Sequence, residues 1–141
     1  TRSDTLSLHD ALPISAMLNT IPMEITFVDE DNINRFFNEG PKDFKRPGMA
    51  IDREVFSCHP PKVEQQVRHI IGEFRKGTLD KVPIWMEKNG KTMLVTYMAV
   101  RDAAGTYLGT MELVQDMGFA KEHFLSDVKA KEAALRAGME D

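Results

Sequence analysis

The stretch VPIWMEKNGKTMLVTYMAVRDAAGTYLGTMELVQD, residues 82–116, decides the fold. It contains three runs rich in β-branched and aromatic residues, a composition typical of strands. We place these strands at Val82–Glu87, Thr92–Arg101 and Thr106–Asp116. Asn89-Gly90 separates the first two, and an Asn-Gly pair is the strongest short-range signal for a β-hairpin. Turn residues from Asp102 to Gly105 separate the second from the third, so the stretch predicts three consecutive antiparallel strands.

A helix pattern lies just before these strands. From Pro61 to Lys76, apolar residues recur at helical spacing, which predicts an amphipathic helix with one face in the core. The stripe consists of Val63, Val67, Ile70 and Phe74, with Ile71 beside it. Pro61 suits the first turn of a helix, and Gly77 is a typical stop residue.

The N-terminal third predicts a hairpin followed by irregular structure. Ile25–Val28 and Ile33–Phe37 are two short strand patterns, and the polar residues from Asp29 to Asn32 favour a turn between them. Prolines and glycines recur from Gly40 to Pro61, which indicates short helical turns at most. The whole order predicts an α+β fold, with a five-stranded antiparallel sheet and helices between its second and third strands.

The first fifteen residues raise a question of origin. TLSLHDALPIS, from Thr5 to Ser15, is the translation of one frame of a widely used sequencing adapter. We therefore expect residues 1–15 to be an adapter-derived artefact and exclude them from the domain. Residues 16–22 predict the remainder of a helix that ends at Pro22.

The chain beyond residue 15 is expected to divide into two parts. Residues 16–118 form one domain, and residues 119–141 form a charged helical tail. Phe124, Val128 and Leu135 recur along that tail at helical spacing. The pattern leaves three alternatives open: the tail packs on its own domain, dimerises, or frays.

Composition narrows the classes of function. The chain has a net charge of −4, a hydrophobic content of 42% and one cysteine. Such mild acidity lacks the clustered basic surface that nucleic-acid binding requires, and no apolar run is long enough to span a membrane. A lone cysteine cannot form an internal disulfide and is typical of a reducing compartment. We expect a cytoplasmic protein that binds neither nucleic acid nor a membrane.

Several motifs resemble a known family. GTYLGTMELVQDM stands where PAS domains end in a glycine-containing strand followed by Asp. Together, LNTIPMEITFVDED, SCHPPK, KVPIWMEKNGK and VTYMAVRDAAGTYLGTMELVQD are similar to a PAS subgroup of uncharacterised prokaryotic proteins, often found after a hemerythrin-like domain. The resemblance covers Met17 to Met117 and implies a PAS-like fold. It also implies a sensory or interaction module, not an enzyme, that binds a small ligand or forms a homodimer, with a hemerythrin-like domain lost upstream.

The resemblance implies a pocket that can hold heme, flavin or another small molecule. A flavin photoadduct is not expected, because Cys58 stands in FSCHPP rather than in a motif like NCRFLQ. Heme needs an axial ligand, usually His, and His59 can turn into the pocket as that ligand. Alternatively, His59 and the following prolines form a structural elbow, with Cys58 packed as a small hydrophobe. His69 and His123 are expected to face solvent.

The other pocket candidates lie on the predicted strands. Trp85 and Tyr97 either stack on a ligand or fill the core or an interface. Met111 and the other strand methionines give either an adaptable pocket lining or ordinary core filling. Glu112 is either solvated or a polar pocket group. No catalytic triad, phosphate-binding loop, zinc set or diiron set can be assigned, so no catalytic residue is expected.

Overall fold

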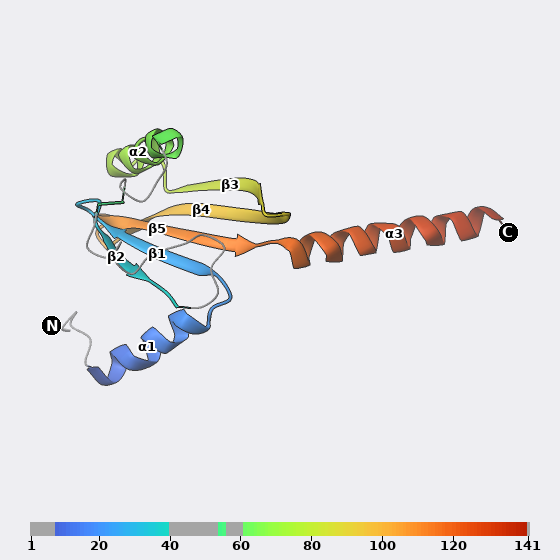
Figure 1. Ribbon diagram of the computed structural model, residues 1–141, viewed down its shortest axis with the longest axis horizontal. Helices are drawn as coiled ribbons and strands as arrows, with labels where there is room; N and C mark the ends of the chain where they lie inside the picture. The colour runs from blue at the N-terminus through green and yellow to red at the C-terminus, as the bar shows by residue number, and fades with distance from the viewer. Residues whose placement is uncertain (1–7, 40–53, 56–60, 141) are drawn as a thin grey trace.

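The computed structural model describes residues 8–39, 54–55 and 61–140, and Figure 1 shows their arrangement. The elements are α1 (Leu8–Thr20), β1 (Glu24–Asp29), β2 (Asn34–Phe37), α2 (Pro61–Lys76), β3 (Lys81–Lys88), β4 (Lys91–Arg101), β5 (Tyr107–Asp116) and α3 (Gly118–Glu140). The five strands form one antiparallel sheet in the order β2-β1-β5-β4-β3. The predicted α+β class, its five-stranded sheet and the helix between the second and third strands are confirmed. The predicted short helical turns fall almost entirely outside the described residues.

The two predicted turns of the C-terminal meander form as expected. Asn89 and Gly90 have φ values of 52° and 76°, the left-handed conformation that a two-residue hairpin loop requires. At the second turn, Asp102 Oδ1 accepts hydrogen bonds of 2.9 Å from the backbone N–H groups of Ala104 and Thr106. Local residue chemistry therefore fixes both reversals of the chain.

The turn between β1 and β2 is built around Asp29. Its Oδ1 accepts hydrogen bonds from the backbone N–H groups of Asp31 and Ile33, and its Oδ2 accepts one of 2.7 Å from Arg35. Burial alone would raise the pKa of Asp29, but the hydrogen bonds from Arg35 and the backbone outweigh burial and hold that pKa below its usual value. The predicted role of Asp29 as a turn residue is confirmed.

Helix α2 covers one face of the sheet, which we call the inner face. Val67, Ile70, Ile71 and Phe74 are all buried, and Phe74 is 0% exposed. They pack in one core cluster with inner-face residues of the central strands, Val28, Met93, Val95, Tyr97 and Val114. The predicted apolar stripe of this helix is therefore confirmed as its buried face.

Helix α1 differs from the expectation, because it begins at Leu8 rather than after residue 15. Pro13 lies inside it, which removes one backbone donor but does not prevent a helix that neighbouring residues favour. Asn38 holds the end of this helix to the sheet: its Nδ2 donates to the carbonyl oxygens of Leu18 and Met23, and its Oδ1 accepts from Ile25 N. The origin of residues 1–15 concerns the DNA and stays a prediction.

Helix α3 is the predicted tail, and Figure 1 shows it projecting away from the sheet. Every residue from Lys121 to Met139 is exposed. None of the described helices is long and apolar enough to cross a membrane.

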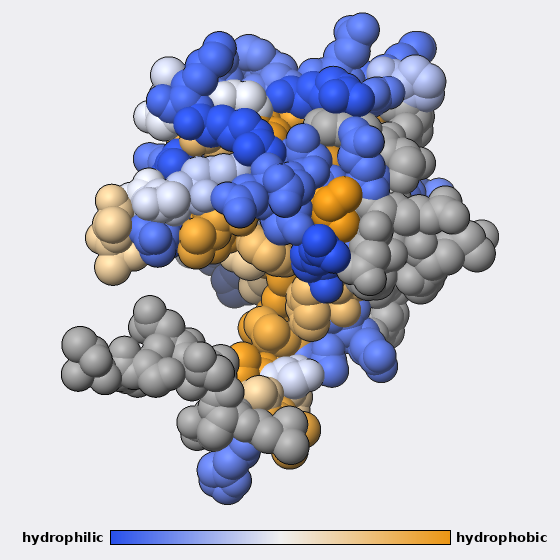
Figure 2. All heavy atoms as spheres, turned by 90° about the vertical axis from the view of Figure 1, so that its left-hand side faces the viewer, coloured by the Kyte–Doolittle hydropathy of each residue, from blue (hydrophilic) through white to orange (hydrophobic). Residues whose placement is uncertain are grey.

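Large apolar side chains are also exposed outside α3. Leu12 and Met17 of α1 are 63% and 65% exposed. Figure 2 shows one end of the molecule, where apolar atoms are visible below a mainly hydrophilic upper part.

Candidate functional site

A group of polar side chains lies on the inner face of the sheet, inside the core. Thr26, Asn34, Thr110 and Glu112 are between 2% and 7% exposed. Strand register brings them together, because Glu112 at the centre of β5 pairs with Thr26 on β1 and with Tyr97 on β4. Core positions are usually apolar, so four hydrogen-bonding side chains in one buried place make this a candidate recognition site.

This buried polar cluster, defined as Thr26, Asn34, Tyr97, Thr110 and Glu112, surrounds a small cavity. Val55, Val67 and Ile71 close the cavity together with Val28. Its volume is about 10 Å³, roughly the space of one water molecule. The site is therefore closed, and a larger occupant has to displace α2 or the segment that carries Val55.

The C-terminal end of α2 is tied to the sheet by two arginines. Arg75 donates to Asn32 Oδ1 at 2.8 Å and to the carbonyl oxygen of Glu30. Arg101, on β4, donates to the carbonyl oxygen of Phe74 at 2.8 Å, and its Nε lies 3.1 Å from Asp80 Oδ1. Both guanidinium groups also lie over the ring of Tyr107, at 5.1 and 6.0 Å from its centroid.

Tyr107 continues this link into the buried polar cluster. Its hydroxyl lies 2.7 Å from the hydroxyl of Thr110. In the middle of α2, Arg68 pairs with Glu64 on the same helix at 2.8 Å and with Glu54 at 3.8 Å.

The predicted pocket residues fall into three groups. Tyr97 is buried and lines the cavity. Trp85 and Met111 do not, because strand side chains alternate and both residues lie on the outer face. Trp85 is 61% exposed there. Cys58 and His59 lie outside the described residues, so an axial role for His59 stays a prediction.

Sequence reasoning missed Thr26, Asn34 and Thr110 as members of the site. A signal was present, because residues two apart share one face of a strand. Thr110 and Glu112 therefore lie on the same face of β5, as Thr26 and the core residue Val28 do on β1. Only the register between β1 and β5 shows that these polar positions meet. His69 and His123 are exposed, as expected. Over the described ranges, no group of three or more His, Cys, Asp or Glu residues could hold a metal ion.

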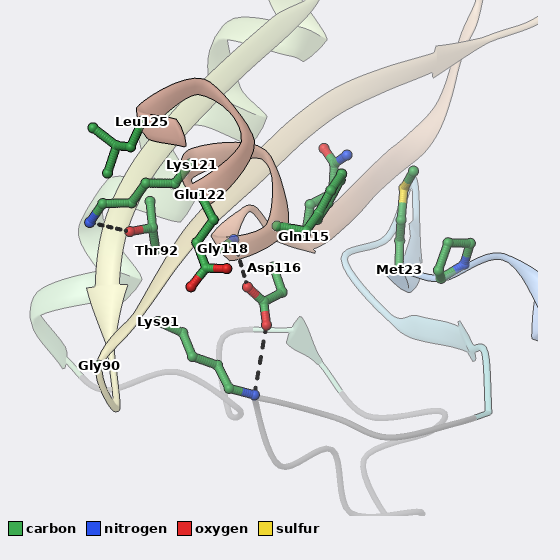
Figure 3. A pocket seen from close by; sticks show the side chains of 12 residues that line it. Met23, Gly90, Lys91, Thr92, Gln115, Asp116, Gly118, Lys121, Glu122 and Leu125 are labelled. Carbon is green, nitrogen blue, oxygen red and sulfur yellow. Dashed lines mark hydrogen bonds and ion pairs between the residues drawn. The ribbon is translucent and has the colours of Figure 1, made fainter. Parts of the chain in front are cut away.

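A second feature is an open groove at the base of α3, shown in Figure 3. Its volume is about 850 Å³, and its lining is mixed. Asp116 Oδ1 accepts a hydrogen bond from Gly118 N at 2.9 Å, and Asp116 Oδ2 lies 3.8 Å from Lys91 Nζ. Lys121 Nζ donates to Thr92 Oγ1 at 3.3 Å. Polar contacts to the start of β4 therefore hold the first turn of α3, while Leu125 lies at the rim of the groove.

Comparisons with known proteins agree on one family. The family model described as the PAS domain matches residues 14–118. The crystal structure of a C-terminal domain from Streptococcus mutans is 38% identical, with a TM-score of 0.74, over 86% of this chain and 94% of that one. No protein of curated function matches the chain.

Two further solved structures share the fold at low identity. The PAS domain of BvgS from Bordetella pertussis is 10% identical with a TM-score of 0.60, over 89% of this chain and 98% of that one. A sensory box sensor histidine kinase from Vibrio cholerae is 12% identical with a TM-score of 0.54, over 77% of this chain and 91% of that one.

Proposed function

Because the chain belongs to the PAS domain family, we propose that it is a sensory module of a signalling or regulatory protein, and that it binds a small ligand at the buried polar cluster. The observation that carries the proposal is the position of Glu112. Its carboxyl group lies on the central strand, beneath α2, with Tyr97 and Thr26 on the neighbouring strands. The sensor histidine kinase among the similar structures supports a sensory role.

The cluster favours a ligand of particular chemistry. A carboxylate accepts hydrogen bonds, and a charge-assisted bond to an ammonium or amidinium group is about twice as strong as a neutral one. The hydroxyls of Thr26, Thr110 and Tyr97 can both donate and accept. A small molecule with a cationic or donor-rich end therefore suits the cluster, with Val67 and Ile71 of α2 covering its apolar part.

Binding would act on the position of α2. The closed cavity holds about one water molecule, so a larger ligand favours states in which α2 is displaced. The contacts of Arg75 and Arg101 hold the C-terminal end of α2 in the closed state, so displacing α2 works against them. Glu112 and Asp116 lie on the same strand, about 13 Å apart, so β5 connects the cluster to the groove at the base of α3.

Native mass spectrometry of the purified full chain tests this proposal. We expect a small added mass in the wild type and in the control variant Glu122→Gln, whose carboxylate is exposed on α3. The added mass should be lost in Glu112→Gln, which keeps the size of the side chain but removes its charge. If Glu112→Gln retained the same added mass, the ligand would have to bind outside the buried polar cluster.

The same purified protein also tests two alternative functions, a heme sensor and a structural dimerisation domain. The cavity is far too small for heme as it stands, so heme would require a large displacement of α2. A Soret band that disappears in His59→Ala would nevertheless establish a heme sensor with His59 as axial ligand. No added mass and no colour would instead favour a structural homodimerisation domain with a filled core.

We also propose that the module is cytoplasmic, follows a hemerythrin-like domain, and belongs to the PAS subgroup with the CHPPK motif. The similar Streptococcus mutans structure is described as a C-terminal domain, which supports an arrangement in which other segments come first. An adapter-free genomic read across the codons of Ser15 and Ala16 tests the upstream part. At the place of TLSLHDALPIS, that read should encode a different sequence that continues upstream into a hemerythrin-like domain.

A further inference from the structure

A β-bulge places Tyr107 on the inner face of the sheet. The register between β4 and β5 shifts by one residue next to Arg101, which leaves Leu108 as the extra residue on β5. A bulge re-aims the side chains beside it. Without the bulge, period-two alternation would put Tyr107 on the outer face together with Gly109. Tyr107 instead packs against the core, and its hydroxyl lies 2.7 Å from that of Thr110.

The hydrogen bond between these two hydroxyls has a favoured direction. Each hydroxyl has one proton to donate. Among the described residues, Thr110 is the only hydrogen-bond partner of the Tyr107 hydroxyl. The guanidinium groups of Arg75 and Arg101 lie over the Tyr107 ring, and they donate but cannot accept. The Tyr107 proton is therefore best satisfied by Thr110 Oγ1, and Thr110 keeps its own proton for another acceptor.

The remaining proton of Thr110 is available to the buried cavity. Thr110 is 2% exposed and lines the cavity, whereas Tyr107 does not line it. Within the described ranges, the Thr110 side chain forms no second hydrogen bond. A buried donor without an acceptor costs free energy, so an occupant that offers an oxygen there gains a hydrogen bond. Glu112 lies two residues further along the same face of β5, about 7 Å away.

We propose that the ligand of the buried polar cluster is a small amine that also carries a hydrogen-bond-accepting oxygen, and that Tyr107 sets this specificity by fixing the Thr110 hydroxyl as a donor. The inference rests on the proposed function, in which Glu112 binds the cationic end of the ligand. It adds the second group of the ligand and its spacing from the first. Tyr107 is a positioning residue, because it acts through Thr110 and lies outside the cavity lining.

The charges near Tyr107 favour an oxygen on that side of the cavity. Arg75 donates to a backbone carbonyl and to Asn32 Oδ1, which are neutral acceptors, and it forms no ion pair in the described part of the chain. Arg101 pairs with Asp80, whose side chain is 80% exposed, so water screens this pair. Two guanidinium groups on one side of the cavity disfavour a second cation there and favour an electron-rich oxygen.

Two matched amines test the proposal by NMR titration of the full chain. 3-Methoxypropylamine carries an ether oxygen that accepts but cannot donate, and pentylamine has a methylene group in its place. The readout is the ratio of the two dissociation constants, pentylamine over 3-methoxypropylamine. Thr110→Val should lower this ratio by about fivefold, which corresponds to the loss of one hydrogen bond. The matched control Thr92→Val removes a strand hydroxyl at the base of α3 and should leave the ratio unchanged.

Tyr107→Phe tests the positioning role, because it keeps the ring beside both guanidinium groups and removes only the hydroxyl. The ratio should fall by roughly twofold, since the Thr110 hydroxyl is then no longer fixed as a donor. A merely structural loss would weaken both amines equally and leave the ratio as it is. An unchanged ratio in Thr110→Val would overturn the binding of an oxygen there, and an unchanged ratio in Tyr107→Phe would overturn the positioning role.

Glu112→Gln separates this inference from the proposed function. It should weaken the binding of both amines alike, because both carry the same ammonium group. If it does so while the ratio does not respond to Thr110→Val, the ligand site at Glu112 stands and the inference about the second group fails. If Glu112→Gln weakens neither amine, or if neither amine binds to the wild type, the proposed site fails and this inference fails with it.

Discussion

Helices α2 and α3 carry similar apolar stripes but have opposite surroundings. In α2, the four apolar residues Val67, Ile70, Ile71 and Phe74 are buried, down to 0% exposure at Phe74. In α3, the apolar residues Leu125, Val128, Leu135 and Met139 are at least 49% exposed. The difference shows that helical periodicity identifies a face that needs a partner but does not say which chain supplies it.

The largest expected difference in stability is between two alanine substitutions, one at an aromatic residue of α2 and one at an aromatic residue of α3. Phe74→Ala removes a fully buried ring from α2 and should lower the free energy of unfolding by about 3–5 kcal/mol. Phe124→Ala, at 65% exposure on α3, should change it by less than about 0.5 kcal/mol. Urea denaturation of both variants at low protein concentration measures the two values. Similar losses would mean that α3 packs against its own domain.

A second comparison concerns two variants that each remove an ion pair, Asp29→Asn and Asp127→Asn. The side chain of Asp29 is 19% exposed and forms an ion pair with Arg35. Asp29→Asn removes this ion pair and weakens the turn between β1 and β2. It should therefore lower the free energy of unfolding by about 1–2 kcal/mol at neutral pH. Asp127→Asn removes the exposed pair with Lys131 and should cost about 0–0.5 kcal/mol. Thermal unfolding of the two variants ranks these losses, and an inverted ranking would count against a structural role for the Asp29 carboxylate.

The same Asp29 variant makes a pH test. Because the folded-state pKa of Asp29 is lowered, its contribution to stability is present above the ordinary value of 3.8 and is lost as the pH falls below it. The difference in stability between wild type and Asp29→Asn should therefore shrink on acidification from pH 6 to pH 3. A difference that stays constant over that range would show that the charge of Asp29 contributes nothing.

The smallest effects come from one glycine in each helix. An added Cβ meets nothing within 4 Å at Gly72 of α2 or at Gly138 of α3. Gly72→Ala should stabilise the fold by about 0.5–1 kcal/mol, because α2 forms together with the core. Gly138→Ala should leave global unfolding unchanged and only raise helix content, as circular dichroism can measure. Equal stabilisation by both substitutions would show that α2 and α3 unfold together as one cooperative unit.

Local chemistry explains why much of the fold was predictable. The left-handed Asn89-Gly90 turn, the Asp29 turn and the stripe from Val67 to Phe74 depend on neighbouring residues, and all three formed as expected. The start of α1 at Leu8 was not predicted, because residues 1–15 were excluded from the domain as adapter-derived.

The candidate site was only partly predictable, because it depends on contacts between distant strands. Glu112 lies 86 positions after Thr26 in the sequence, yet the two residues pair across β1 and β5. Period-two alternation places residues on one face of a strand but does not say which face is covered, so Trp85 and Met111 could not be separated from Tyr97 in advance. The register and α2 together define the inner face.

Amide hydrogen exchange of the full chain at two protein concentrations, about tenfold apart, tests most directly whether α2 is held by its own domain and α3 by a second copy. We predict strong protection of α2 at both concentrations and protection of α3 that increases with concentration. That increase should be absent in Leu135→Asp, which places a charge in the stripe. Protection of α3 that is independent of concentration, or unaffected by Leu135→Asp, would contradict the account.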